Sequence, residues 1–166
     1  INLVRFKEIN PTSNEAPSVY PEDVEVRDAK KELLRLAKGD SILMINEAHM
    51  YPQHRIFMKS VLADLYKLGY RQLCMEALDE DVLLTRRKEQ RPFYPTRDMG
   101  VYLKEPSMAE MVREAIRIGY TLHGYDGYMA TNRDSLSAEN IIRIQKEYAN
   151  DKLLIFCGHG HNMEYS

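Results

Sequence analysis

Short apolar runs alternate with segments of helical periodicity along this chain, and this alternation limits the folds open to it more than any other feature. The runs cover residues 42–46, 71–77, 120–125 and 153–157, lengths typical of buried strands. Apolar residues at helical spacing mark the segments 22–38, 53–68, 78–90, 106–118 and 135–149. Because parallel strands need crossover connections of this length, the alternation predicts an α/β fold with a mostly parallel central sheet and helices on both faces.

The length of 166 residues is typical of one domain. We therefore expect residues 1–166 to form a single α/β domain, in which residues 1–21 are an N-terminal strand or tail followed by a loop. Residue 1 is Ile rather than Met, so we expect the sequence to be a fragment or a processed form of a longer chain.

The net charge limits the kinds of molecule that the chain is expected to bind, and the positions of the cysteines indicate whether a disulfide forms. A net charge of −2 and a pI of about 6.2 give no reason to expect that the chain binds nucleic acid. No apolar run is long enough to predict a transmembrane segment, and a small-molecule substrate or ligand is the expected partner. Cys74 and Cys157 lie inside apolar runs, which favours two buried free thiols over a disulfide.

Acidic residues and histidines follow the predicted strands, at the point where each strand ends. They are Glu47 and His49, then Glu76, then His123 and Asp126, and finally His159 and His161. The carboxyl ends of parallel strands meet at one edge of a sheet, where α/β proteins bind ligands. The sequence therefore predicts a site at that edge, although polar residues are also common at loop ends that have no function.

Two chemistries suit these side chains. His49 could be a general base that deprotonates water, with Glu47 and Glu76 orienting it, while His161 stabilises charge on the substrate. Alternatively, the same four side chains could hold a divalent metal, Zn or Mn. The chain has neither a Gly-x-Ser-x-Gly motif nor a cysteine in an exposed basic turn, so no covalent nucleophile is predicted.

Two arginines lie near these positions in the sequence. Arg55 comes early in the helix that follows Pro52, and it is either solvated or a partner of Glu47 or of a substrate anion. Arg133 and Asn140 are seven residues apart and so share a face if their helix begins early enough. The residues predicted to contact a substrate or ligand are Arg55, His123, Asp126, Arg133 and His159.

Two longer segments carry a resemblance to a known superfamily. Residues 45–78, INEAHMYPQHRIFMKSVLADLYKLGYRQLCMEAL, give a strand ending in Glu-x-His, a helix, and a second strand ending in Glu. Residues 132–164 give Arg-Asp, then Ala-x-Asn, then a strand that ends in a turn with two histidines. This order resembles the erythromycin esterase, ChaN and Tiki/TraB superfamily.

The resemblance implies a role for each matching residue. Those that match are Glu47, His49, Arg55, Glu76 and His161, with His159 beside the last. Esterase-like members imply a hydrolase that acts on an ester, lactone or amide through a water-activating histidine, and Tiki-like members imply metal-dependent proteolysis. ChaN-like members imply haem or iron binding and an extracytoplasmic location. The single residue between Glu47 and His49 is closer to the ChaN-like spacing, and Asn46 stands where Gly is usual.

Overall fold

The computed structural model describes residues 27–91, 94–128 and 130–162, with the backbone alone for residues 161 and 162. Its helices are α1 (Ala29–Ala37), α2 (Pro52–Lys67), α3 (Glu80–Lys88), α4 (Pro106–Ile118) and α5 (Arg133–Glu147). Its strands are β1 (Ile42–Glu47), β2 (Tyr70–Met75), β3 (Thr121–Gly124) and β4 (Lys152–Gly158). The 3-10 helices η1 (Arg97–Met99) and η2 (Val101–Lys104) precede α4, and η3 (His159–Asn162) follows β4. The predicted strand or tail at 1–21 lies outside the described residues.

The described strands form one parallel sheet in the order β1-β4-β2-β3, which confirms the predicted α/β fold. β4 is last in the sequence but lies between β1 and β2. Asn46 pairs with Cys157 on one side of β4, and Met75 pairs with Phe156 on the other. The chain that follows β4 therefore emerges between the ends of β1 and β2.

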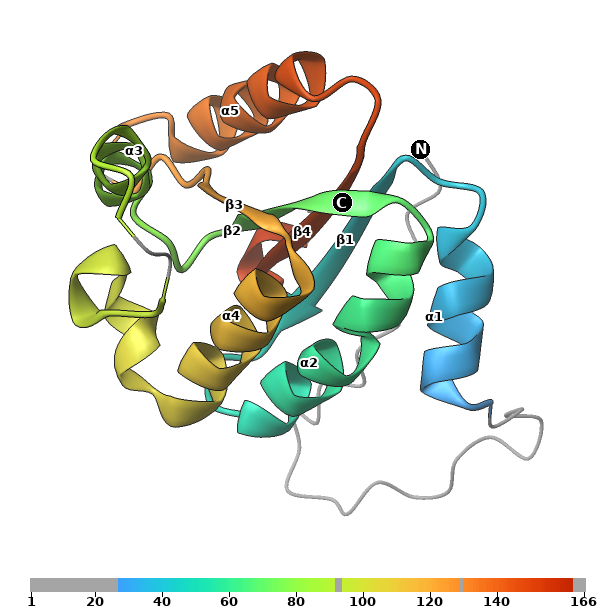
Figure 1. The fold of residues 1–166 in the computed structure, drawn as a ribbon. Helices are drawn as coiled ribbons and strands as arrows, with labels where there is room; N and C mark the ends of the chain where they lie inside the picture. Colours follow the sequence, from blue (N-terminus) through green and yellow to red (C-terminus); the bar gives the residue numbers. More distant parts are fainter. Residues whose placement is uncertain (1–26, 92–93, 129, 163–166) are drawn as a thin grey trace, which may run out of the picture.

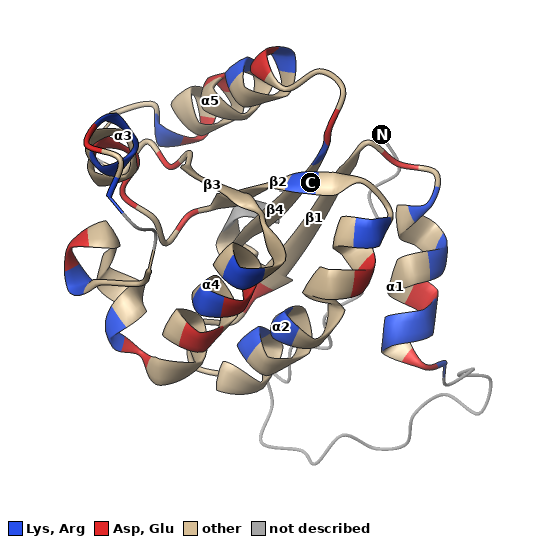
Figure 2. Ribbon diagram, viewed as in Figure 1, with Lys and Arg blue, Asp and Glu red and all other residues tan. Residues whose placement is uncertain are grey.

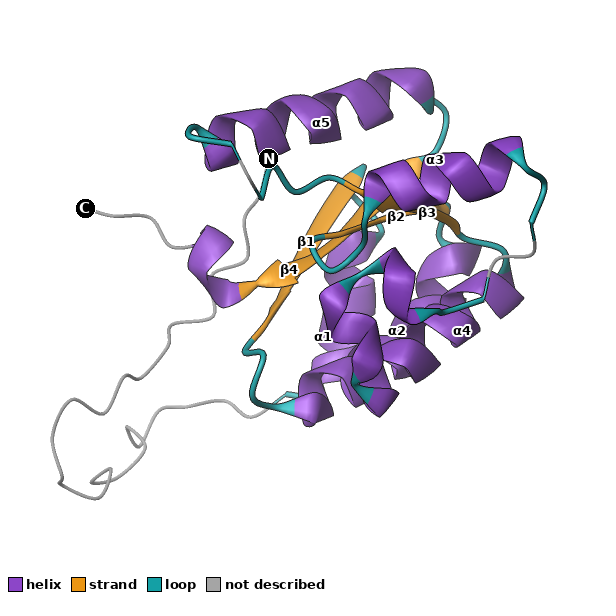
Figure 3. Ribbon diagram, turned by 90° about the vertical axis from the view of Figure 1, so that its left-hand side faces the viewer, coloured by secondary structure: helices purple, strands orange, loops and turns teal. Residues whose placement is uncertain are grey.

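Helices cover both faces of the sheet, as predicted (Figures 1 and 3). α1, α2 and α4 pack on one face, where Leu73, Leu154 and Phe156 meet Leu62 and Met111 in the larger core. α5 lies on the opposite face and packs Ile144 against Cys74, Leu153 and Ile155. Cys74 and Cys157 are both buried and are not joined by a disulfide, which confirms the interpretation from sequence.

Capping residues set the helix boundaries. α1 begins at Ala29 rather than at residue 22, because the Asp28 side chain accepts a hydrogen bond from the Lys31 amide and acts as the N-cap. Residues 22–26 of that predicted helix lie outside the described residues. α4 covers 106–118 as predicted, with Pro106 in its first turn and Gly119 closing it at φ 111°.

Among the helices that the structure describes, none has both the length and the apolar character that a membrane span requires.

Candidate functional site

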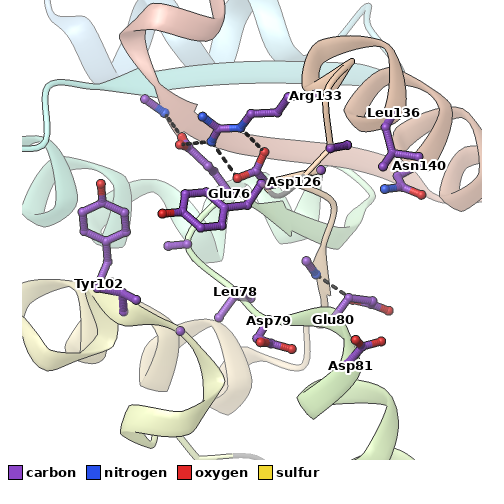
Figure 4. Close-up of a pocket in the computed structure, with 18 of the residues that line it drawn as sticks. Glu76, Leu78, Asp79, Glu80, Asp81, Tyr102, Asp126, Arg133, Leu136 and Asn140 are labelled. Atoms are coloured by element: carbon purple, nitrogen blue, oxygen red, sulfur yellow. Dashed lines mark hydrogen bonds and ion pairs between the residues drawn. The ribbon is translucent and has the colours of Figure 1, made fainter.

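A cavity of about 1140 Å³ opens at the C-terminal edge of the sheet, where the sequence predicts a site. Five of the predicted site residues line it: His49, Glu76, Asp126, Arg133 and His159. Figure 4 shows Glu76, Asp126 and Arg133 grouped on one side, with Tyr102 facing the cavity from another element. The start of α3, η2 and α5 supply further lining residues: Asp79, Glu80, Asp81, Leu84, Val101, Leu136, Asn140 and Arg143.

Glu47 and His49 form a hydrogen-bonded pair at the end of β1. Glu47 is 2% exposed, and its Oε1 lies 2.8 Å from Nδ1 of His49. An ionised carboxylate can only accept, so the Nδ1–H of His49 is the donor; in the neutral form of the imidazole, Nε2 is then an acceptor. The ring of His49 stacks on Tyr102 with centroids 4.6 Å apart. One ring nitrogen and one ring face are thus fixed by neighbours.

Arg55 holds Glu47 from the side of α2 and is not solvated. Its side chain is 2% exposed; Nε lies 2.6 Å from Glu47 Oε2, and Nη2 lies 2.9 Å from Glu47 Oε1. Nη2 also donates to the His49 carbonyl oxygen at 3.1 Å. The hydrogen bond to Glu47 raises the pKa of Arg55, against the opposing effect of burial. The guanidinium therefore fixes both the carboxylate and the backbone of this pair.

The segment from η2 to the start of α4 completes this network. Glu105 accepts hydrogen bonds from Arg55 Nη1 at 2.8 Å, from the Ser107 amide at 3.0 Å and from the Met108 amide at 2.8 Å. Desolvation would raise the pKa of Glu105, but the hydrogen bonds from Ser107, Arg55 and Met108 outweigh it and lower the pKa to about 2. Glu105 is thus both the N-cap of α4 and a partner of Arg55.

Tyr102 and Glu105 are not among the predicted site residues, because residues 91–104 contain Pro92, Pro95 and Gly100 and show no periodic pattern, which is typical of an irregular excursion. Glu is not among the preferred N-cap residues, so the residue type at position 105 does not indicate a helix start. The excursion packs closely on the loop after β2, since a side chain at Gly100 would overlap the carbonyl oxygen of Ala77. That close approach allows Tyr102 to reach His49.

Glu76 follows β2 and lies next to the His49 ring across Gly158. Its Oε2 accepts from the Gly158 amide at 2.6 Å, and its Oε1 accepts from Arg133 Nη2 at 3.0 Å. A methyl group at residue 158 would lie 2.7 Å from His49 Nε2 and 3.1 Å from Glu76 Oε2. The imidazole nitrogen and the carboxylate therefore flank one point on the cavity surface.

Arg133 and Asp126 form a second ion pair beside Glu76 (Figure 4). Nε and Nη2 of Arg133 lie 2.7 and 2.6 Å from the two carboxylate oxygens of Asp126. The hydrogen bond to Asp126 raises the pKa of Arg133, although burial opposes the effect. Asn140 lies on the same helix, as the spacing predicts, and donates to the Tyr125 carbonyl at 3.0 Å. Arg133 thus links the ends of β2 and β3.

His123 does not line the cavity, although it is a predicted ligand-binding residue. It is 3% exposed, its Nε2 lies 2.8 Å from Gln72 Oε1, and its ring packs near Tyr148 of the turn after α5. Burial lowers the pKa of His123 to about 4, and the charges of Arg87 and Arg143 act in the same direction. The structure therefore places His123 in the core beneath α5.

In the described part of the chain, no three His, Cys, Asp or Glu side chains lie so that they could hold a metal ion. The structure therefore gives no ligand set for the predicted metal site there. Both oxygens of Glu47 are bound by Arg55, which neutralises the charge that a cation would need. The side chain of His161 is not among those that the structure describes, so its predicted role stays a prediction.

No protein-family model matches the chain, and no curated protein matches it. Solved structures do share its fold. Type III effector HopBA1 aligns with a TM-score of 0.59 at 16% identity, over 80% of this chain and 72% of that one. RRSP, a MARTX toxin effector domain from Vibrio vulnificus CMCP6, aligns with a TM-score of 0.53 at 15% identity, over 80% of this chain and 30% of that one. A structure of the C-terminal region of Pasteurella multocida toxin also gives 0.53, at 10% identity, over 80% of this chain and 21% of that one.

Proposed function

We propose that the chain is a hydrolase that activates water at His49 and Glu76 for attack on an ester, lactone or amide. The observation that carries the proposal is the paired geometry of His49. Glu47 binds Nδ1 at 2.8 Å, while Nε2 lies beside Glu76 at the cavity. The resemblance to the erythromycin esterase, ChaN and Tiki/TraB superfamily agrees with it and is proposed with it.

The positions of the two groups suit a bridging water. A water between His49 Nε2 and the Glu76 carboxylate would donate one hydrogen bond to each, since both are acceptors. Its lone pairs would then face the cavity and the carbonyl carbon of a substrate. As the oxygen attacks, His49 Nε2 takes the proton, and Glu47 stabilises the imidazolium that forms. The bond between the carbonyl carbon and the leaving oxygen or nitrogen then breaks, and the proton passes from Nε2 to that leaving atom.

Direct attack by water fits the residues around the cavity better than a covalent intermediate does. None of the described lining residues is Ser, Thr or Cys. The Pasteurella multocida toxin structure is named for a thiol-protease like catalytic triad in its C-terminal region, but both cysteines here are buried. Burial raises the pKa of each thiol to about 12, so a thiolate nucleophile is not available.

The charge of the described lining argues against the haem alternative, although the lining also holds residues of the types that can ligate haem iron, His49, Tyr102, Tyr128 and His159. Five carboxylates and two arginines line the cavity: Glu76, Asp79, Glu80, Asp81, Asp126, Arg133 and Arg143. Haem carries anionic propionates, which this excess of negative charge would repel. We therefore restrict the proposal to hydrolysis.

The test is turnover of chromogenic esters, lactones and peptide amides by the purified protein. We expect activity that His49→Gln lowers by about 100-fold or more, the usual contribution of a general base, and that persists in the presence of a chelator. Glu76→Gln should lower it as well.

His54→Gln is the matched control, because His54 is exposed and lies outside the lining. Its Nδ1 accepts a hydrogen bond from the Ala48 amide at 3.0 Å, and the Gln side chain keeps an acceptor for that amide. Equal turnover in the His49→Gln and His54→Gln variants would contradict the proposal, and so would the absence of turnover in every substrate class.

A further inference from the structure

We infer that Glu105 is a positioning residue for His49 that acts through Arg55. The inference deepens the proposed function, and only its catalytic consequence rests on that function. The Glu105 side chain is 36% exposed and belongs to the N-terminus of α4. It does not line the cavity, so any effect on the reaction must pass through its neighbours.

A continuous series of hydrogen bonds joins Glu105 to the imidazole. Glu105 Oε2 lies 2.8 Å from Arg55 Nη1, Arg55 Nη2 lies 2.9 Å from Glu47 Oε1, and that same oxygen lies 2.8 Å from His49 Nδ1. Arg55 and Glu47 are each 2% exposed. Because water hardly reaches these two side chains, their orientation depends on protein partners.

The planar shape of the Arg55 guanidinium explains why the contact of Nη1 with Glu105 affects the contact with Glu47. Its donors lie in one plane in a fixed fork, so a rotation that frees one donor moves all of them. Nε and Nη2 bind Glu47, while Nη1 binds Glu105. Without Glu105, Nη1 is a buried donor without its acceptor, and rotation to find another would pull Nε and Nη2 away from Glu47.

Charge gives a second reason. Two carboxylates share the single positive charge of Arg55 in the present arrangement. If Glu105 is removed, Glu47 alone neutralises Arg55, and its Oε1 becomes a weaker acceptor for the Nδ1–H of His49. Both effects loosen the contact that fixes the imidazole.

Two substitutions separate this role from helix capping. Glu105→Ser and Glu105→Asp both leave a preferred N-cap residue at the start of α4, and neither side chain is long enough to keep the contact with Arg55. Asp28→Ser is the matched control, because Asp28 is an acidic N-cap of α1 that accepts from the Lys31 amide and does not contact Arg55.

The direct readout is the NMR signal of the His49 Nδ1–H, assigned by its loss in His49→Gln. We expect a downfield signal in the wild type that shifts or exchanges faster with solvent in both Glu105 variants and stays unchanged in Asp28→Ser. Turnover should fall by about 10–100-fold through kcat, with KM nearly unchanged, as for a group displaced from its productive position.

The outcomes distinguish this inference from the proposed function. An unchanged Nδ1–H signal in both Glu105 variants overturns the inference, whatever the activity. If the signal responds but the wild type hydrolyses nothing, the positioning role stands and the hydrolase proposal falls. If turnover depends on His49 but neither turnover nor the signal responds at residue 105, the hydrolase proposal stands and the positioning role falls.

Discussion

Arg55 is the residue on which the buried charges of the site depend. Removing it would leave the Glu47 carboxylate, 2% exposed, without its cationic partner. Breaking one side of a buried ion pair costs about 3–5 kcal/mol. We therefore expect Arg55→Met to lower the free energy of unfolding in urea by about that amount.

The control for Arg55→Met is the same substitution at an arginine that forms an ion pair on the surface. Arg117 pairs with Glu114 at 2.8 Å on the outer side of α4, where Figure 2 shows charges of both signs, and its side chain is 72% exposed. Exposed pairs contribute at most about 1 kcal/mol, so Arg117→Met should change stability little. A similar loss in both variants would mean that Arg55 is not buried as described.

Gly158 tests the proximity of His49 and Glu76 directly. A methyl group there would lie 2.7 Å from His49 Nε2 and 3.1 Å from Glu76 Oε2, closer than carbon normally approaches either atom. We expect Gly158→Ala to displace both side chains and to lower turnover by about 100-fold. Gly39→Ala, where a methyl group would meet nothing within 4 Å, should leave turnover unchanged, and equal activity in the two variants would refute the placement.

At the scale of elements, the N-cap of α4 should make the stability of the protein depend on pH in the acidic range. The pKa of Glu105 is lowered from 4.5 to about 2, so its stabilising effect is fully present above pH 4.5 and is lost as the pH falls toward 2. The difference in urea midpoint between wild type and Glu105→Gln should therefore be largest near neutral pH and should shrink through that window. A difference that grows with acidification would contradict the assignment of Glu105 as an ionised cap.

The elements were largely predictable from sequence, and the contacts between them were not. Periodicity predicts the strands and helices to within two residues, because each is a local pattern with its own start and stop residues. The exception is the start of α1, which is predicted at residue 22 and lies at Ala29. The order β1-β4-β2-β3 depends on which apolar surfaces meet, which no local pattern records. Alternation along β3 could have placed His123 correctly: Leu122 joins the larger core, and His123 points to the opposite face, toward α5.

Part of the site followed from the same logic. Once the strands are parallel, Glu47, His49 and Glu76 must gather at one edge. The contributions of Tyr102 and Glu105 come from an irregular segment whose path depends on tertiary packing at Gly100. A sequence without a periodic pattern could not predict that path.

For the molecule as a whole, His123 should make the free energy of unfolding depend on pH between pH 6.5 and 4. Its pKa is lowered from 6.5 to about 4 by burial, so the unfolded chain binds a proton in this range that the folded chain does not. Stability is therefore lost as the pH falls through the window, by up to about 3 kcal/mol. His123→Asn should remove this part of the pH dependence, measured as the wild-type-minus-variant difference in unfolding free energy. A constant difference from pH 7 to 4 would show that His123 ionises normally.

The central position of β4 has a consequence for biosynthesis. β1 and β2 do not pair with each other, because β4 lies between them, and Gly158 at its end separates His49 from Glu76. A ribosome adds about 5–20 residues per second, so the nascent chain waits on the order of ten seconds between the synthesis of β1 and that of its pairing partner. Throughout that interval the edges of β1 and β2 are open to other strands. The two halves of the site, His49 after β1 and Glu76 after β2, first meet when β4 is inserted between these strands.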